Sequence, residues 1–250
     1  MRAVRALVSG VAVVAFVALG GSAGVSAQPL AACTGGWEAV QTPTPPNVSS
    51  GLSAVSAASS TDAWAIGFKE TFIPPPPHAF GFLLHWDGAS WTEVPDADPT
   101  APLTLAGVVD IAPGDAWAVG FTPDFGIPQQ PRVEHWDGVR WTVVATPSLA
   151  DAELNAVTAI SSTDVWAVGS QFDDQRNQST LTEHWDGSAW SIVPSPNQQS
   201  NPTFLTAVAA RASNDVFAAG GVFSGPDGEH GFVIRWNGTA WSTVRVPLLS

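Results

Sequence analysis

The sequence Thr182-Glu183-His184-Trp185-Asp186-Gly187-Ser188-Ala189-Trp190 decides the fold of this chain, because variants of it occur four times. Each variant places an Asp-Gly or Asn-Gly step between two short stretches in which apolar and polar residues alternate. This pattern is a strong local signal for a β-hairpin. The other copies are His85-Trp86-Asp87-Gly88 with Trp91, His135-Trp136-Asp137-Gly138 with Trp141, and Arg235-Trp236-Asn237-Gly238 with Trp241. The repeat predicts the architecture, but it names neither a ligand nor a reaction.

The hairpin belongs to a longer unit with a period near 50 residues. Spacings of 53, 49 and 51 residues separate Trp64, Trp117, Trp166 and Phe217, and the full units begin at Leu52, Leu105, Leu154 and Leu205. A period of this size made of short strands is typical of propeller arrays rather than helical solenoids.

Each unit divides into four expected strands. The first is rich in small residues (154–160), and the second alternates large and small side chains and ends at a glycine (164–169). The third ends at His-Trp, and the fourth runs from the next Trp to a Val and stops at a Pro, which cannot donate to a sheet. A sheet with two apolar faces must be covered on both, and stacking sheets around an axis does so. We therefore expect an all-β chain that folds as a β-propeller of four four-stranded blades.

The N-terminal residues Trp37–Val40 match the last strand of a unit, as in Trp91–Pro95. In a ring closed at four blades, this strand and Trp241–Val246 would compete for one outer edge. We therefore expect an incompletely closed array, in which Trp37–Val40 is an extra outer strand or two chains complete each other as a homodimer.

The unit resembles Kelch-type propeller blades, whose second strand ends in Gly-Gly and whose fourth begins with Trp. Gly220-Gly221 keeps the double glycine, whereas Gly67-Phe68, Gly120-Phe121 and Gly169-Ser170 depart from it. The Asp-Gly-x-x-Trp turn also looks like the Asp-box hairpin of sialidase-like propellers, without the usual order of residues. The whole unit is similar to repeats in uncharacterised exported bacterial proteins. This resemblance covers nearly all of the chain after the N-terminus and implies a propeller without an established activity.

The first 27 residues have the pattern of a secretory signal peptide. Arg2 and Arg5 precede an apolar run (6–19), and Val25-Ser26-Ala27 supplies small residues for cleavage. We expect a signal peptide at 1–27, an N-terminal segment at 28–50, a propeller domain at 51–250, and secretion. The alternative is a lipid-anchored surface protein, because Leu30-Ala31-Ala32-Cys33 spells a lipobox. Lipidation of Cys33 would provide the only expected membrane tether.

Composition narrows the classes of function. The chain has 22 acidic and 9 basic side chains, a formal net charge of −13, one Cys, twelve Trp and no Tyr. Such a charge repels nucleic acid, so we expect no nucleic-acid partner. Sialidases and copper–radical oxidases on related propellers need a Tyr, and no nucleophile-elbow, zinc-protease or phosphate-loop motif occurs. We expect no cofactor and no metal. A glycosidase with a carboxylate pair stays open, because such pairs are recognised by distance.

Residues that recur at one repeat position are expected to be structural. His85, His135 and His184 would lie on different blades, and Arg235 replaces the fourth. The turn residues accept bonds from nearby backbone N–H groups, which Asn does as well as Asp. The predicted structural turn residues are Asp87, Asp137, Asp186 and Asn237.

The units disagree in the connections between the second and third strands, which span 69–79, 122–131, 171–180 and 222–231. Variable loops on a rigid scaffold commonly carry recognition. Each connection has an aromatic residue near its start, with acidic residues close to most. The candidate ligand-binding residues on this loop face are Phe72, Phe125, Phe172, Asp173, Asp174, Phe223 and Asp227. The alternative is that they are solvated loop residues.

Three hypotheses for function follow. The first is an exported, non-enzymatic propeller that binds a glycan or protein ligand through the loop face. The second is a glycoside hydrolase acting on polysaccharide with loop-face carboxylates. The third is a purely structural cell-surface protein.

Overall fold

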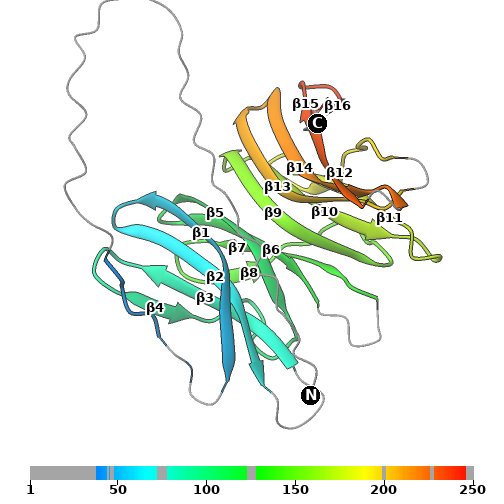
Figure 1. Ribbon diagram of the computed structural model, residues 1–250. Coiled ribbons are helices and arrows are strands. Elements are labelled where there is room, and N and C mark those ends of the chain that lie inside the picture. Colours follow the sequence, from blue (N-terminus) through cyan, green and yellow to red (C-terminus); the bar gives the residue numbers. More distant parts are fainter. Residues whose placement is uncertain are drawn as a thin grey trace, which may run out of the picture. The chain divides into compact units, whose positions relative to one another are not determined.

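The computed structural model describes residues 38–43, 45, 48–71, 78–122, 128–198, 201–225 and 228–245. The strands within them form four antiparallel sheets, each built from four consecutive strands (Figure 1). The blades are β1 (Ser49–Ser59), β2 (Asp62–Thr71), β3 (His78–Trp86), β4 (Trp91–Val94); β5 (Thr104–Ala112), β6 (Asp115–Phe121), β7 (Pro131–Trp136), β8 (Trp141–Val143); β9 (Ala152–Ser161), β10 (Asp164–Phe172), β11 (Gln178–Trp185), β12 (Trp190–Ile192); and β13 (Thr203–Ala212), β14 (Asp215–Phe223), β15 (Glu229–Trp236), β16 (Trp241–Val244). The prediction of four four-stranded blades is confirmed.

The repeated Asp-Gly step forms the turn between the third and fourth strands of each blade. In the third blade, Asp186 Oδ1 accepts hydrogen bonds from the backbone N–H groups of Ser188 at 2.8 Å and Ala189 at 3.0 Å. Asp87, Asp137 and Asn237 make the same pair of bonds in their own turns. The next residue has a positive φ, 93° at Gly187, which glycine adopts without steric cost.

The glycine at the end of each expected second strand is required by a bulge in the first strand. In the third blade, Val168 pairs with Ala156 and Gly169 pairs with Leu154, so Asn155 is left unpaired. A β-carbon at Gly169 would lie 2.0 Å from the carbonyl oxygen of Glu153. A β-carbon added at the equivalent glycines, Gly67, Gly120 and Gly220, would likewise lie 1.9 to 2.0 Å from a backbone carbonyl oxygen.

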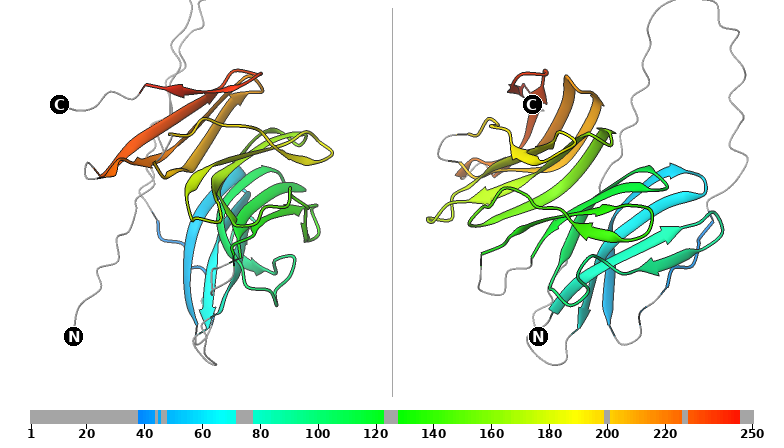
Figure 2. Two further views of the ribbon diagram at one scale, coloured as in Figure 1. Left: turned by 90° about the vertical axis from the view of Figure 1, so that its right-hand side faces the viewer. Right: turned by 180° about the vertical axis from the view of Figure 1, so that it is seen from behind.

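Consecutive blades are joined by tryptophan side chains. Trp64 of the first blade packs against Trp136 and Trp141 of the second, with ring centroids 4.9 and 4.8 Å apart. Trp117 makes the same contacts with Trp185 and Trp190, and Trp166 makes them with Trp236 and Trp241. Three apolar clusters surround these rings, so the core lies between consecutive blades. Figure 2 shows the order of the sheets along the chain. Aromatic pairs at these separations stabilise the fold by about 1 kcal/mol each beyond their burial.

Two sequence expectations differ from the structure. The extra outer strand at Trp37–Val40 is not formed at its described residues, because Glu38, Ala39 and Val40 have no strand pairing and are exposed; Trp37 lies outside the described residues. The second and third strands are also longer than expected. The connections between them shrink to 72–77, 122–130, 173–177 and 224–228, because backbone pairing continues past the glycine.

Candidate functional site

The antiparallel order of the strands places two kinds of connection at the same end of each blade. These are the connections between second and third strands and the links from one blade to the next, at 95–103, 144–151 and 193–202. We call this end the loop end. The opposite end carries the Asp-Gly turns, and we call it the turn end.

Two of the predicted ligand-binding aromatics are strand residues rather than loop residues. Phe172 is the last residue of β10 and is half-buried, with the guanidinium of Arg176 5.2 Å from its ring centre. Phe223 ends β14 and is exposed, with its ring centre 5.6 Å from that of Phe204. Phe72, Phe125 and Asp227 lie outside the described residues, as does Cys33.

Asp173 stabilises the loop that it opens. Its Oδ1 accepts the backbone N–H groups of Gln175 and Asn177 at 2.8 and 2.9 Å, and its Oδ2 accepts the Asn177 side-chain amide at 2.8 Å. The side-chain bond from Asn177, together with these backbone N–H groups, lowers the pKa of Asp173. Asp174 beside it is exposed. Asp173 therefore fixes the loop, whereas Asp174 stays open to a ligand.

A cleft of about 520 Å³ lies at the loop end of the third blade, between that blade and the link that leads to the fourth blade. Five of its seven lining residues carry a side-chain amide and one carries a hydroxyl, and none of the seven is charged. We call it the amide cleft; it is lined by Asn177, Gln178, Ser179, Asn197, Gln198, Asn201 and Pro202. The loop after Phe172 forms one wall, and the link between the two blades forms the other.

Internal hydrogen bonds hold the two walls of the amide cleft together. Asn197 Oδ1 accepts the backbone N–H of Thr180 at 2.7 Å and its hydroxyl at 3.0 Å. Between the link and the start of β13, the backbone N–H of Gln198 donates to Thr203 Oγ1 at 3.3 Å. Gln198 is exposed and its bond uses the backbone, so its side-chain amide is free to meet a ligand.

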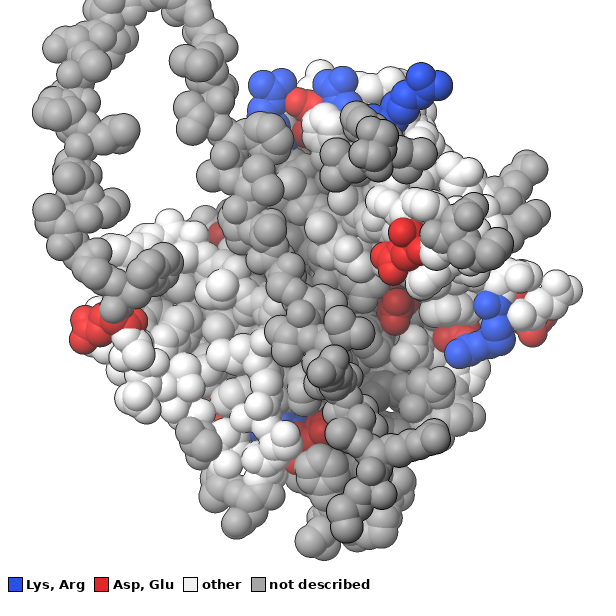
Figure 3. Space-filling view, viewed as in Figure 1, with Lys and Arg blue, Asp and Glu red and all other residues white. Residues whose placement is uncertain are grey.

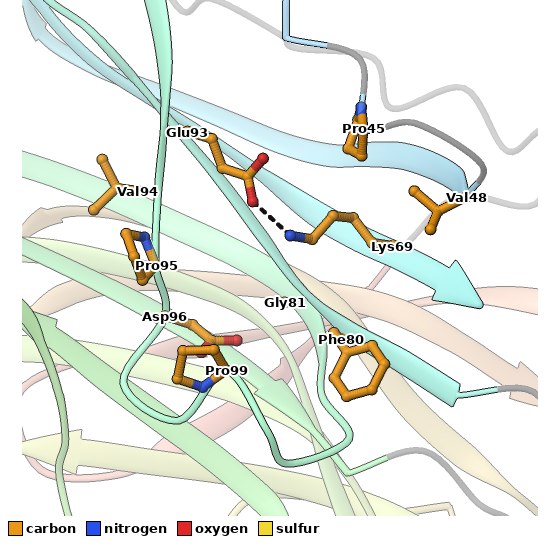
Figure 4. A pocket seen from close by; sticks show the side chains of 10 residues that line it. All are labelled: Pro45, Val48, Lys69, Phe80, Gly81, Glu93, Val94, Pro95, Asp96 and Pro99. Carbon is orange, nitrogen blue, oxygen red and sulfur yellow. Dashed lines mark hydrogen bonds and ion pairs between the residues drawn. The ribbon is translucent and has the colours of Figure 1, made fainter.

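A second cleft, of about 350 Å³, lies at the loop end of the first blade (Figure 4). It is mainly apolar, and an ion pair crosses it between Lys69 Nζ and Glu93 Oε1 at 2.5 Å. We call it the proline cleft; it is lined by Pro45, Val48, Lys69, Phe80, Gly81, Glu93, Val94, Pro95, Asp96 and Pro99.

Asp96 is buried beneath the proline cleft. Its carboxylate fits there because Gly81 has no side chain: a β-carbon at Gly81 would lie 2.4 Å from Asp96 Oδ2. Neither oxygen makes a hydrogen bond with a described residue. Burial, with the nearby Glu134 carboxylate, raises the pKa of Asp96 to about 6. Glu134 is itself fully buried and bonded to Arg132 Nε at 3.0 Å, so the two carboxyl groups form an internal cluster.

The recurring histidines form hydrogen bonds with aspartates near the turn end. His85, His135 and His184 each place Nε2 2.7 to 2.8 Å from an aspartate at the start of the second strand. In the fourth blade, Arg235 takes this place and bonds Asp215 at 2.8 Å. Because an arginine can replace the histidine at this position, the position is structural.

The described residues contain no group of His, Cys, Asp or Glu suited to a metal ion, and no helix in them could span a membrane.

Comparison with known proteins gives the fold. No family model and no curated protein matches the chain. Among solved structures, it resembles the GH93 α-L-arabinofuranosidase of Fusarium graminearum in complex with arabinobiose, with a TM-score of 0.50 and 14% identity over 80% of this chain and 67% of that one. It also matches YCF48 bound to D1 peptide, with a TM-score of 0.38 and 12% identity over 82% and 86% of the two chains. The arabinofuranosidase likeness supports the propeller fold alone.

Proposed function

We propose that this chain is a non-enzymatic β-propeller that binds a neutral glycan in the amide cleft. The observation that carries the proposal is the lining of that cleft, which offers amides and a hydroxyl without a charged side chain. Amide side chains both donate and accept hydrogen bonds, and so do the hydroxyl groups of a sugar. A volume of about 520 Å³ is within the usual range for small-ligand sites.

Charge favours a neutral ligand over an anionic one. The chain has a formal net charge of −13, which repels acidic polysaccharides and leaves neutral sugars unaffected. The two bonds from Thr180 to Asn197 Oδ1 hold the side-chain amide of Asn197 in place before binding. A prearranged set of polar groups raises affinity because less side-chain motion is lost on binding.

The proline cleft favours a second candidate, a protein ligand. Its proline and phenylalanine side chains suit an apolar peptide segment, and Lys69 and Glu93 are exposed enough to exchange their mutual ion pair for one with the ligand. The hydrolase alternative gains no support from Asp96 and Glu134, because Glu134 is fully buried and bonded to Arg132.

A glycan array with the purified chain tests the proposal, followed by calorimetric titration of the best neutral oligosaccharide. Replacing Gln198 with Ala should weaken binding about fivefold, because a hydrogen bond to a neutral partner contributes roughly 1 kcal/mol. The matched control is Asn214→Ala, which removes an exposed amide from a turn at the opposite end. The affinity of this control variant for the oligosaccharide should equal that of the unmodified chain.

Failure to bind any neutral glycan, or equal loss of affinity in the two variants, would contradict the proposal. Binding of peptides instead, with sensitivity to Glu93→Ala, would favour the proline cleft.

We also propose that the chain is exported. The proposal rests on the N-terminal pattern at 1–27, which lies outside the described residues. N-terminal sequencing of the protein recovered from culture medium should begin at Gln28, whereas recovery in membranes with a lipid on Cys33 would support the lipid-anchored alternative.

A further inference from the structure

Each joint between blades combines two different faces. The inserting face belongs to the earlier blade of each pair and presents the aromatic residue of its second strand. In the first blade this residue is Trp64, and Ile66 and Leu83 belong to the same face. The receiving face of the next blade presents a leucine and a valine of its first strand together with its two hairpin tryptophans. In the second blade, this receiving face consists of Leu105, Val108, Trp136 and Trp141.

The first blade has a receiving face that no described residue fills. Leu52 is 48% exposed and Val55 is 69% exposed, whereas Leu105, Leu154 and Leu205 at the position of Leu52 are fully buried. A groove of about 350 Å³ lies on this face and is lined by Thr42, Leu52, Ser53, Ala54, Val55, Ala65 and Trp91. In the three joints between consecutive blades, the equivalent groove is filled by the second-strand tryptophan of the preceding blade.

The fourth blade has an inserting face that no described residue of another blade covers, although the guanidinium of Arg235 on the same blade lies 5.4 Å from the centre of the Phe217 ring. Phe217 is 41% exposed, although Trp64, Trp117 and Trp166 at the same repeat position are buried. Ala219 and Val233 beside it are half-buried, whereas Ile66 and Leu83 at their positions in the first blade are fully buried. The two end blades thus carry the two halves of one joint.

We propose that a second copy of this chain forms this joint, with Phe217 of one copy in the groove beside Trp91 of the other. The first-strand bulge supplies a matching hydrogen bond. Asn155 at the bulge of the third blade donates to Leu205 O at 3.1 Å across its joint, and Ser53 donates to Leu105 O at 2.7 Å. Thr206 is the bulge residue of the fourth blade and is exposed, so its hydroxyl is placed to donate to Leu52 O of the second copy.

Charge also favours a second copy. Arg211 and Arg235 lie at the turn end of the fourth blade, where Figure 3 shows basic side chains gathered, and the two arginines share one carboxylate, that of Asp215, so a positive charge is left over. The rest of the chain is acidic, with a formal net charge of −13 overall. The basic end of one copy is therefore attracted to the body of another. The contact is head-to-tail, so each copy uses a different face.

Light scattering on the full chain over a range of concentrations tests the proposal. The unmodified chain should have at least twice the mass of one chain. Phe217→Asp, which breaks the inserting face, and Leu52→Asp, which breaks the receiving face, should each give the mass of one chain. The control Val139→Asp places the same charge at an exposed valine of a hairpin turn, outside both faces, and should associate like the unmodified chain.

A mixture of the two face variants gives the sharpest result. Each retains the face that the other lacks, so the equimolar mixture should form a two-chain species although neither variant associates alone. This recovery also shows that both variants are folded. An unmodified chain with the mass of one chain, a mixture that stays dissociated, or association that survives either single variant would overturn the proposal.

Discussion

Glu183 offers a quantitative test of the interior, because no residue that the structure describes bonds its carboxyl group. It is fully buried on β11, and neither of its oxygens makes a hydrogen bond with a described residue. Burial raises its pKa from 4.5 to about 7. The same repeat position holds Leu84 in the first blade and Ile234 in the fourth.

The pKa shift fixes the sign of the pH dependence. Between about pH 4.5 and 7, the folded state keeps a proton on Glu183 that the unfolded state has lost. Stability therefore falls as the pH rises through this window. With about 1.4 kcal/mol for each pKa unit, the raised pKa destabilises the fold by about 3 kcal/mol at pH 8 and by about 1 kcal/mol at pH 5.

Glu183→Gln removes the titration and keeps the shape of the side chain. Its free energy of unfolding relative to that of the unmodified chain should rise by about 2 kcal/mol between pH 5 and pH 8. Urea unfolding followed by tryptophan fluorescence measures this difference and cancels the contributions of Asp96 and other groups. The control Glu134→Gln changes the equivalent residue, which is paired with Arg132, and should destabilise at both pH values. A Glu183→Gln difference that does not change with pH would refute the reasoning.

Three further results are expected. Gly169→Ala should destabilise the fold by about 3 kcal/mol or prevent folding, because its β-carbon would lie 2.0 Å from Glu153 O; a melting temperature equal to that of the unmodified chain would contradict the bulge argument. Asp186→Ala should cost about 1 kcal/mol in urea unfolding, because two turn N–H groups lose their acceptor, and an unchanged midpoint would show that the bonds contribute nothing. Phe172→Ala combined with Asp174→Ala should weaken glycan binding with a nearly unchanged melting temperature, since both lie beside the amide cleft; a large drop in melting temperature would instead identify Phe172 as a core residue.

The repeat made the fold predictable because the same physical requirement recurs in every blade. The Asp-Gly step requires a tight turn, and the second-strand tryptophan requires a covering blade, so four copies predict four blades. The longer strands were missed because pairing beyond Gly169 depends on the partner strand, which the local sequence does not reveal.

The candidate site was harder to predict than the fold. Strand order predicts that the connections between second and third strands share one end with the links between blades, and the sheet topology has them there. The sequence pattern favours the aromatic residues at the ends of the second strands, which do not line the amide cleft. The amide cleft lies partly in the link between blades, where the run Asn197-Gln198 and Asn201 was a usable signal. Asp96 and Glu183 gave no such signal, because burial of a carboxyl group depends on tertiary packing.

Hydrogen–deuterium exchange with and without the best neutral oligosaccharide tests the account of function most directly. Ligand should slow exchange in segments 173–180 and 195–203, which form the two walls of the amide cleft. Protection confined to the hairpin turns at the opposite end, or to 93–99 beside the proline cleft, would contradict the assignment of the amide cleft as the binding site.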